Sequence, residues 1–412
     1  MKAEDASRIL AEFRPGLEVY LQGAVGEPLA LREALMAEPE ALSGVSLTGC
    51  FIPGINDFDY AALNPMARLT SFMLAPAFRP SFETGQVVVR PMAYSQIVEA
   101  LRSGPAPDLA ILQVTPPDGE GECSFGPCAD FSPLVARRAR RRLALVNPLL
   151  PRPRRGPSIP FTALEVAIEV EAPFITVAEP APTPAHSEIA RRVAAMVPDG
   201  AAIQTGIGGV PAAALAELAK RRGLRVHTGM VTEGYRLLDE AGALAPREDI
   251  VTGFAYGSAA FVKWACDRCV FADANETHGP ARLGRVDRLF AVNSALEIDL
   301  FGQANIEWRA GQLVSGLGGA PDFSRAARRS RGGRAILAMP ASAGRVSRIV
   351  PRLASPTVSL PGADADLVIT ERGIADVRGL AFDDRAEALI AIAAPEHRAD
   401  LTRAWAEIRR GL

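Results

Sequence analysis

The chain has 412 residues, 48% of them hydrophobic, so it can bury a large core and is long enough for two or three domains. Its 45 basic residues are balanced by 47 acidic ones, and the net charge of −2 gives no reason to expect binding to nucleic acid. The opening MKAEDASRILAEF is charged from the second residue on, and no run of about 18 uncharged apolar residues occurs, so we expect neither a signal peptide nor a membrane span.

Strand-like and helix-like runs alternate in the first half of the chain. Residues 29–37 and 94–103 have the character of helices, and in the second of these Ile97 and Leu101 lie four residues apart on one face. The alternation predicts a parallel α/β architecture. The strands that we expect here cover residues 17–23, 45–50, 85–92, 108–114 and 142–147.

A second α/β series follows a proline-rich segment. Residues 178–187, AEPAPTPAHS, are expected to link two domains, and a helix over 187–197 is expected to begin with Ser187 as its N-cap. We therefore expect an N-terminal α/β domain over residues 1–180 and a C-terminal α/β domain over residues 187–412. The later strands that we expect cover residues 201–206, 224–229, 249–257, 287–293, 334–340 and 366–373.

The segment QTGIGGVPAAALAEL, residues 204–218, places three glycines between a predicted strand and a predicted helix. Such a loop presents unpaired backbone N–H groups and the positive end of a helix dipole, which favour an anion or a developing oxyanion. The glycines do not have the GxGxxG spacing of a dinucleotide-binding loop, and no Gly-Lys-Ser/Thr of a P-loop follows. The alternative is that they serve only a tight turn packed beneath a neighbouring element.

Six further stretches, taken with the glycine loop, resemble the acetyl-CoA hydrolase/transferase family. These are the family I coenzyme A transferases, which include 4-hydroxybutyrate and butyrate CoA-transferases. The resemblance is collinear over nearly the whole chain. It rests on ILQVTPPDGEGECSFG (111–126), RVHTGMVTEG (225–234), FAVNSALEIDLFGQANIE (290–307), VSGLGGAPDF (314–323), VSRIVPRL (346–353) and LVITERGIADVRG (367–379).

This resemblance implies an α/β fold of two similar open α/β/α domains of the CoA-transferase type, a fold shared with sugar-phosphate isomerases, with the active site at their interface. It implies a cytoplasmic homodimer or higher homo-oligomer that moves coenzyme A between a short-chain acyl-CoA, such as acetyl-CoA, and a small carboxylic acid. Coenzyme A would be a substrate, and no tightly bound cofactor is expected.

The same resemblance implies two CoA-contacting loops. The second of them would be Gly318 and Gly319. The first would contact CoA and donate backbone N–H groups to the thioester oxyanion; it consists of Gly206, Ile207, Gly208, Gly209 and Val210.

One residue departs from the pattern of the family. In most members the catalytic glutamate lies in a His-Thr/Ser-Glu-Met sequence, about 23 residues beyond the first glycine of the loop. Here that stretch reads His227-Thr228-Gly229-Met230, so glycine occupies the position of the nucleophile. Glycine can form neither an acyl anhydride nor a thioester, and the mechanism of the family therefore cannot be transferred to this position.

Three explanations are open. The carboxylate could come from elsewhere: Glu233 is nearest in sequence but also suits a helix cap, and Asp57 lies in a glycine- and proline-flanked loop where aspartate often serves a turn. Alternatively a water could replace the glutamate, with His227 as general base, which would make the protein an acyl-CoA hydrolase. In the third explanation the protein binds CoA esters without turning them over.

Other polar groups receive plainer interpretations. Five cysteines, an odd number, suit free thiols in a reducing compartment, and CDRC at 266–269 has no second pair of ligands, so we expect no metal site. Glu297 and Asp299 are interpreted as structural. The arginines of PRPRRG (151–156) could bind the phosphates of CoA, or form a plain exposed loop.

Overall fold

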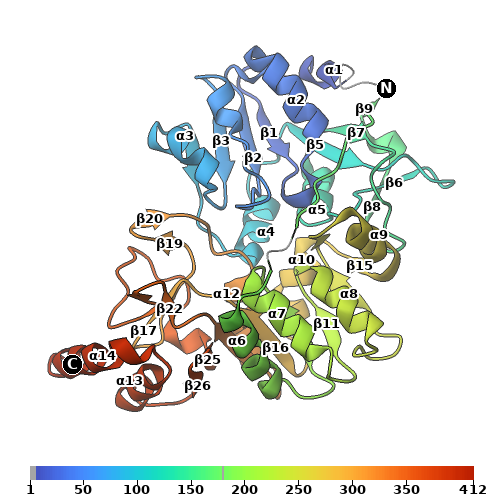
Figure 1. The fold of residues 1–412 in the computed structure, drawn as a ribbon. Coiled ribbons are helices and arrows are strands. Elements are labelled where there is room, and N and C mark those ends of the chain that lie inside the picture. Colours follow the sequence, from blue (N-terminus) through green and yellow to red (C-terminus); the bar gives the residue numbers. More distant parts are fainter. Residues whose placement is uncertain (1–5, 179–180) are drawn as a thin grey trace.

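The computed structural model describes residues 6–178 and 181–412. Figure 1 shows two α/β units, the first in blue and cyan and the second in green to red, with α4 (Tyr94–Ser103), α10 (Ala274–His278) and α12 (Ala320–Arg329) lying between them. Within the described residues, no helix is long and apolar enough to cross a membrane.

The first unit is built on a seven-stranded sheet in which all neighbouring strands are parallel. Helices cover both faces, so a central strand such as Leu109–Val114 is buried along its whole length. The helices are α1 (Ser7–Leu10), α2 (Leu29–Ala37), α3 (Arg79–Glu83), α4 and α5 (Ser132–Arg138). The strand order is β4 (Val87–Val89), β3 (Arg68–Ser71), β2 (Ser46–Gly49), β1 (Glu18–Leu21), β5 (Leu109–Val114), β7 (Arg141–Val146), β9 (Val166–Glu169).

The second unit contains an eight-stranded sheet that is parallel except for its last strand, which forms an antiparallel hairpin with the strand before it. The strand order is β15 (Val270–Phe271), β13 (Ile250–Thr252), β11 (Arg225–His227), β10 (Ala202–Thr205), β16 (Leu289–Asn293), β21 (Arg334–Ala338), β25 (Leu367–Thr370), β26 (Gly373–Asp376). Its helices are α6 (Pro184–Met196), α7 (Gly209–Leu218), α8 (Glu233–Glu240), α9 (Ala259–Arg268), α10, α11 (Pro280–Leu283), α12, α13 (Phe382–Ala391) and α14 (Pro395–Arg409).

The two sheets share one topology. In each, the first strand lies in the interior, the next three follow on one side in succession, and the later strands add on the other side. The order in which successive strands are added therefore reverses between β1 and β5 in the first sheet and between β10 and β16 in the second. Ligands of open α/β sheets bind at the carboxyl end of such a switch point. This repetition confirms the expected fold of two similar open α/β/α units.

Short strands complete the chain. Met230–Val231 (β12) pairs with Phe254–Ala255 (β14), so the strand expected over 249–257 is in fact two strands that break at Gly253. The other pairs are β6 (Glu122–Ser124) with β8 (Ser158–Pro160), β17 (Glu297–Asp299) with β18 (Ala304–Asn305) and β24 (Ile349–Val350), β19 (Trp308–Arg309) with β20 (Gln312–Leu313), and β22 (Ser342–Ala343) with β23 (Val346–Ser347).

Two local expectations need correction. Helix α6 begins at Pro184, three residues earlier than expected, and Thr183 rather than Ser187 is its N-cap, with its side chain accepting from the His186 N–H. A proline at the first helical position and a threonine before it are favourable, which explains the earlier start. Strands β3 and β9 were not expected from the sequence, because RLTS and VAIE are only four residues long and do not stand out.

The two units are joined by hydrogen bonds across their facing edges. The Tyr94 N–H donates to the Gly318 carbonyl (3.1 Å), and the Ala274 N–H donates to the Asp130 carbonyl (2.7 Å). The Asp322 carboxylate accepts from the N–H of Ser95 (3.0 Å) and from its hydroxyl (2.5 Å). The bonds of Tyr94 and Ser95 hold α4 of the first unit against the start of α12 of the second, and the bond of Ala274 joins α10 to the segment before α5.

Candidate active site

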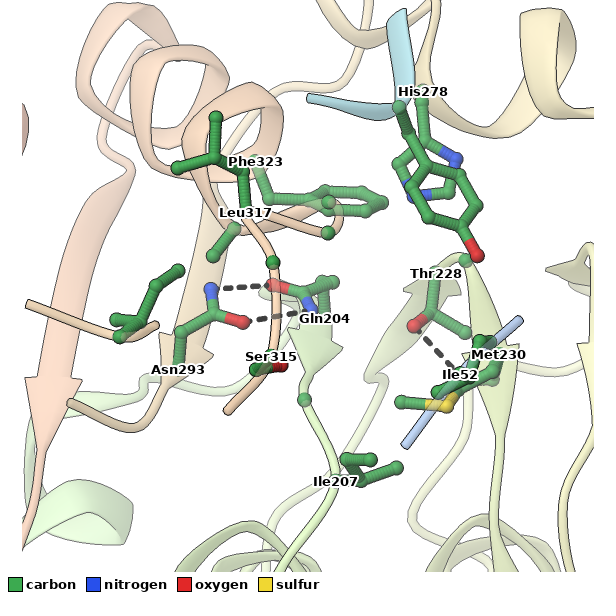
Figure 2. A pocket seen from close by; sticks show the side chains of 18 of the residues that line it. Ile52, Gln204, Ile207, Thr228, Met230, His278, Asn293, Ser315, Leu317 and Phe323 are labelled. Atoms are coloured by element: carbon green, nitrogen blue, oxygen red, sulfur yellow. Dashed lines mark hydrogen bonds between the residues drawn. The ribbon is translucent and has the colours of Figure 1, made fainter. Parts of the chain in front are cut away.

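A cavity of about 240 Å³ lies where the carboxyl ends of the two sheets meet. The first unit contributes Ile52 and Met73, which follow β2 and β3, together with Tyr94 at the start of α4. The second unit contributes the segments that follow β10, β11 and β16, and the loop at residues 315–320. The cavity thus lies at the switch point of the second sheet, where the fold favours a ligand. Figure 2 shows the side chains around it.

The predicted glycine loop reaches the cavity with its first two residues only. Gly206 and Ile207 line the cavity, whereas Gly208, Gly209 and Val210 do not. Gly208 has a φ of +116°, a conformation that favours glycine, and is the N-cap of α7.

The amides of the loop differ in availability. The Gly206 N–H is used in the sheet, where it donates to the Val292 carbonyl (3.0 Å). For the N–H groups of residues 207–210 the described part of the chain provides no hydrogen-bond partner. The loop therefore offers unpaired donors at the start of a helix.

Gly209 has a separate structural role. A Cβ atom there would lie 2.3 Å from Nδ1 of His186, so glycine is needed for the packing of α6 against α7. The packing interpretation of the glycines thus applies to this position.

The second glycine pair lies on the opposite wall of the cavity. Gly318 has a φ of +56°, and its carbonyl accepts the Tyr94 N–H that joins the two units. A Cβ atom at Gly319 would lie 2.5 Å from Nε2 of His278. Both glycines line the cavity, and both are constrained by what surrounds them.

Gly229 also lines the cavity, and its position has no space for a side chain. A Cβ atom there would lie 2.6 Å from Cε1 and 2.7 Å from Nε2 of the same His278. Such distances are shorter than any van der Waals contact, and the neighbour is a buried ring held by two aromatic side chains. The imidazole therefore takes the volume into which a side chain at position 229 would extend.

The three side chains considered as catalytic lie outside the cavity. Glu233, in the first turn of α8, accepts from the Ser258 hydroxyl (2.5 Å) and N–H (3.3 Å) at the start of α9, which is a capping arrangement. Asp57 accepts from the Gly54 N–H (3.3 Å) within its own turn. His227 is buried and is not part of the lining of the cavity, with Nε2 3.1 Å from the Thr277 carbonyl. None of the three lines the cavity, although Glu233 and His227 are close to Gly229 in sequence.

His278 is the side chain that the sequence analysis missed. It is 3% exposed and lines the cavity from the end of α10. Its ring packs against Tyr94 in a tilted arrangement (centroids 4.4 Å apart) and against Phe323 edge to face (5.0 Å apart), and Nδ1 lies 2.8 Å from the Thr277 hydroxyl. Burial, with a smaller contribution from His227, lowers the pKa of His278 to about 3, so the imidazole is neutral at physiological pH. A histidine in NETHGP carries no motif that could have identified it.

The lining of the cavity contains no carboxylate among the described residues; His278 and Tyr94 are its titratable side chains. Burial raises the pKa of the Tyr94 hydroxyl well above its usual range, so this group is neutral as well. The Gln204 and Asn293 amides exchange two hydrogen bonds (3.1 and 3.4 Å) at the ends of β10 and β16, as drawn in Figure 2. The site is therefore an uncharged, largely apolar cavity.

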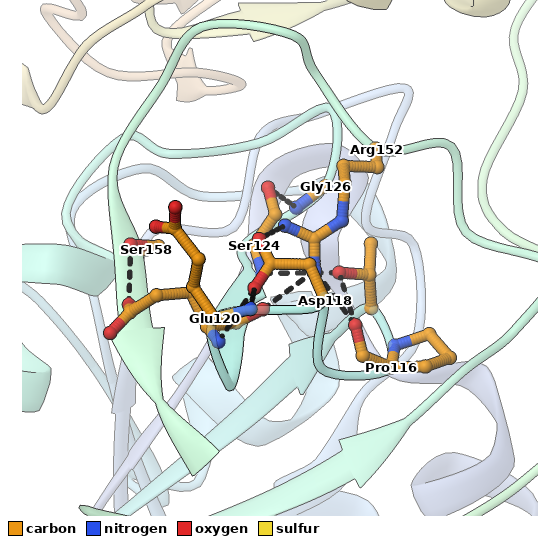
Figure 3. Close-up of polar contacts among 9 residues, drawn as sticks. Pro116, Asp118, Glu120, Ser124, Gly126, Arg152 and Ser158 are labelled. Atoms are coloured by element: carbon orange, nitrogen blue, oxygen red, sulfur yellow. Dashed lines mark hydrogen bonds and ion pairs between the residues drawn. The ribbon is translucent and has the colours of Figure 1, made fainter.

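The arginines of residues 151–156 are occupied by carboxylates. Figure 3 shows Arg152 bound to Asp118 and to the backbone carbonyls of Pro116 and Glu122. The next two arginines, Arg154 and Arg155, pair with Asp267 (2.8 Å) and Asp249 (2.6 Å). All three are thus paired with carboxylates on this surface.

The remaining polar candidates are also accounted for. The five cysteines are free, buried thiols, and the described residues contain no group of side chains arranged to hold a metal ion. The Asp299 carboxylate accepts from the N–H groups of Phe301 (3.1 Å) and Gln303 (2.9 Å), and the Glu297 carboxylate accepts from the Asn305 amide (3.2 Å). These carboxylates stabilise the turn between β17 and β18.

Two open α/β sheets of one topology, with a glycine loop at the switch point of the second, are the architecture expected of a CoA-transferase. Residues 1–162 match the acetyl-CoA hydrolase/transferase N-terminal domain, and residues 257–405 match the acetyl-CoA hydrolase/transferase C-terminal domain. The chain belongs to the acetyl-CoA hydrolase/transferase family, as the sequence resemblance implied.

Named relatives extend over the whole chain. It is 28% identical to 4-hydroxybutyrate coenzyme A transferase from Clostridium kluyveri, over 97% of this chain and 96% of that one. It is 31% identical to succinyl-CoA:acetate/propanoyl-CoA:succinate CoA transferase from Fasciola hepatica, over 98% and 87%. The crystal structure of 4-hydroxybutyrate CoA-transferase from Porphyromonas gingivalis superposes with a TM-score of 0.81 at 28% identity, covering 100% of this chain and 97% of that one.

Proposed function

We propose that the protein is a CoA-transferase that moves coenzyme A from a short-chain acyl-CoA, such as acetyl-CoA, to a small carboxylic acid. The observation that carries the proposal is the cavity at the junction of the two units, with the unpaired amides of residues 207–210 beside it. Such amides stabilise the oxyanion that forms when a thioester carbonyl is attacked. A cavity of about 240 Å³ suits a short acyl group.

The test is an exchange assay. Acetyl-CoA and an isotopically labelled carboxylic acid are incubated with the protein, and the new CoA ester is detected by mass spectrometry. We expect labelled acyl-CoA to form in proportion to released acetate. Failure to form a new CoA ester with any of a panel of short-chain mono- and dicarboxylic acids would overturn the proposal.

Acyl-CoA hydrolysis is the second candidate. The same amides would stabilise the oxyanion if water were the attacking group, and a relative that matches 48% of this chain is an acetyl-CoA hydrolase from Saccharomyces cerevisiae. This activity would release free CoA without an added acid. A protein that only binds CoA esters would do neither, but its melting temperature would rise with CoA.

The wider setting is proposed on the same basis. We place the protein in the cytoplasm as a homodimer or higher homo-oligomer, with coenzyme A as substrate, no tightly bound cofactor, and neither nucleic acid nor membrane as partner. We also divide the chain into domains at residues 181–186. The oligomeric state is testable by light scattering on the purified protein.

A further inference from the structure

We propose that the acceptor acid itself replaces the missing enzyme nucleophile: its carboxylate, held by the Nε2–H of His278, attacks the thioester directly while both substrates are bound. This inference rests on the proposed CoA transfer and specifies how it occurs. It predicts a ternary complex and no covalent enzyme intermediate.

The first support is the absence of an enzyme carboxylate at the reacting position. No aspartate or glutamate lines the cavity within residues 6–178 and 181–412. The side chain that would carry one is absent at Gly229, and the adjacent volume is filled by the imidazole of His278. The attacking oxygen must therefore come from a substrate.

The second support is the hydrogen-bonding state of His278. The Thr277 hydroxyl lies 2.8 Å from Nδ1, a length typical of an O–H donor, while its distances to the carbonyls of Asp273 and Ala274 are 3.3 and 3.5 Å. We assign the hydroxyl proton to the bond with Nδ1. The ring proton then lies on Nε2, the ring nitrogen that lies against Gly229 and Gly319, both of which line the cavity.

The third support is electrostatic. Burial keeps the pKa of His278 near 3, so the imidazole stays neutral and donates a hydrogen bond without neutralising an acid bound to it. The N-termini of α7 and α12 lie beside the cavity, and their positive ends favour a negative charge there. Asp322, in the first turn of α12, is engaged by Ser95 and is not a lining residue. A carboxylate is thus stabilised but keeps its charge for the attack.

The reaction balances without a proton donor or acceptor. An oxygen of the acceptor carboxylate bonds to the thioester carbonyl carbon, and the C–S bond breaks. The products of this step are the mixed anhydride of the two acids and CoA as its thiolate. The thiolate then attacks the acceptor's carbonyl carbon, the C–O bond on that side breaks, and the donor acid leaves as carboxylate. One oxygen of the acceptor thereby passes to the released donor acid.

That oxygen provides the decisive experiment. Acetyl-CoA is mixed with enzyme in excess and an acceptor acid labelled with ¹⁸O in both oxygens, and the acetate from a single turnover is analysed. We expect acetate with one ¹⁸O atom. Unlabelled acetate together with a new CoA ester would overturn this inference, because an enzyme carboxylate would have supplied the oxygen, while leaving the proposed function intact. No new CoA ester would overturn the proposed function itself.

Variants of His278 test its role. His278→Phe keeps an aromatic ring but removes the donor, and we expect the KM for the acid to rise at least tenfold with a change of less than twofold for acyl-CoA. His278→Gln keeps an N–H donor and should recover part of the loss. His397→Gln, in α14 and outside the lining of the cavity, is the matched control. Equal KM values for the acid in all four proteins, each checked for folding by circular dichroism, would contradict the assignment.

Discussion

At the scale of single residues, Gly229 and His278 form a steric pair. A side chain at 229 and an imidazole at 278 compete for one volume, since a Cβ atom would approach the ring to 2.6 Å. The ring is fixed by Tyr94 and Phe323 and cannot move aside cheaply. Glycine at position 229 and the imidazole at position 278 are therefore sterically matched in this chain.

This pair makes a prediction for a designed reversal. Gly229→Glu alone should lose activity and about 1–3 kcal/mol of stability, because the added atoms overpack the cavity. Gly229→Glu combined with His278→Ala has room for the carboxylate, and we expect an enzyme-bound thioester that borohydride traps, with parallel-line kinetics. The His278→Ala single variant is the control and should show neither. If the double variant is as unstable as Gly229→Glu, the steric pairing is wrong.

The buried imidazole also predicts a pH dependence of stability. Because the pKa of His278 is lowered to about 3 from 6.5, the unfolded chain binds a proton in this window that the folded protein does not. Above pH 6.5 the histidine is neutral in both states and does not lower the free energy of unfolding. As the pH falls from 6.5 toward 3, the free energy of unfolding decreases by up to about 1.4 kcal/mol per pH unit. The unfolding free energy of wild type and of His278→Gln is measured by urea unfolding at several pH values. We expect it to fall less steeply with decreasing pH in the variant. Identical slopes would contradict the burial of a neutral histidine.

At the scale of elements, the turn between β10 and α7 carries the free amides that we propose for the thioester. Tyr235 of α8 holds this turn, since its hydroxyl lies 3.0 Å from both the N–H and the hydroxyl of Thr205. The Gly206 amide continues the sheet, and the free amides begin one residue later. The turn leaves the amides of residues 207–210 free as donors. Gly206 continues the hydrogen bonding of the sheet, and Gly208 provides the positive φ from which α7 begins.

A graded substitution tests this element. A Cβ atom at Gly206 would lie 3.2 Å from Oδ1 of Asn293, which small shifts can accommodate, so Gly206→Ala should fold and keep part of the activity. Gly206→Val adds two methyl groups beside the cavity and should reduce turnover at least a hundredfold. It should also abolish thermal stabilisation by CoA. Wild-type turnover in the valine variant would refute the assignment of the loop.

At the scale of the whole molecule, the site exists only because two units are held edge to edge. The Asp322 carboxylate is 7% exposed and accepts two hydrogen bonds from Ser95 of the other unit, and its burial raises its pKa despite these bonds. The residue thus joins α12, which borders the cavity, to α4, which carries Tyr94 into it.

Removal of this link should affect stability and catalysis together. Ser95→Ala leaves a buried carboxylate without its hydroxyl partner, which we expect to cost about 1–3 kcal/mol of unfolding free energy. The KM for acyl-CoA should rise as the two walls lose their register. Ser103→Ala, in the same helix but bonded only to the exposed Glu99, is the control and should change neither. Urea unfolding measures the change in unfolding free energy, and initial-rate kinetics measure the change in KM.

The sequence by itself determined the fold class, the family, and most of the helices and strands near the cavity. Helices α2 and α4 have the bounds that were expected, because their apolar spacing and the residues around them are local signals. It also identified Gly206, Ile207, Gly229, Gly318 and Gly319, which the folded chain brings to one cavity. Whether these residues bind CoA stays a prediction.

Only the tertiary structure decided which side chain faces Gly229. Glu233 was the nearest carboxylate along the chain, but helix α8 directs it to the start of α9. His278, 49 positions beyond Gly229, is instead brought against that glycine. The physical reason is that periodicity and motifs report the conformation of neighbouring residues. Close contact between residues far apart depends on how α10, α4 and α12 pack together, and no local pattern encodes that packing.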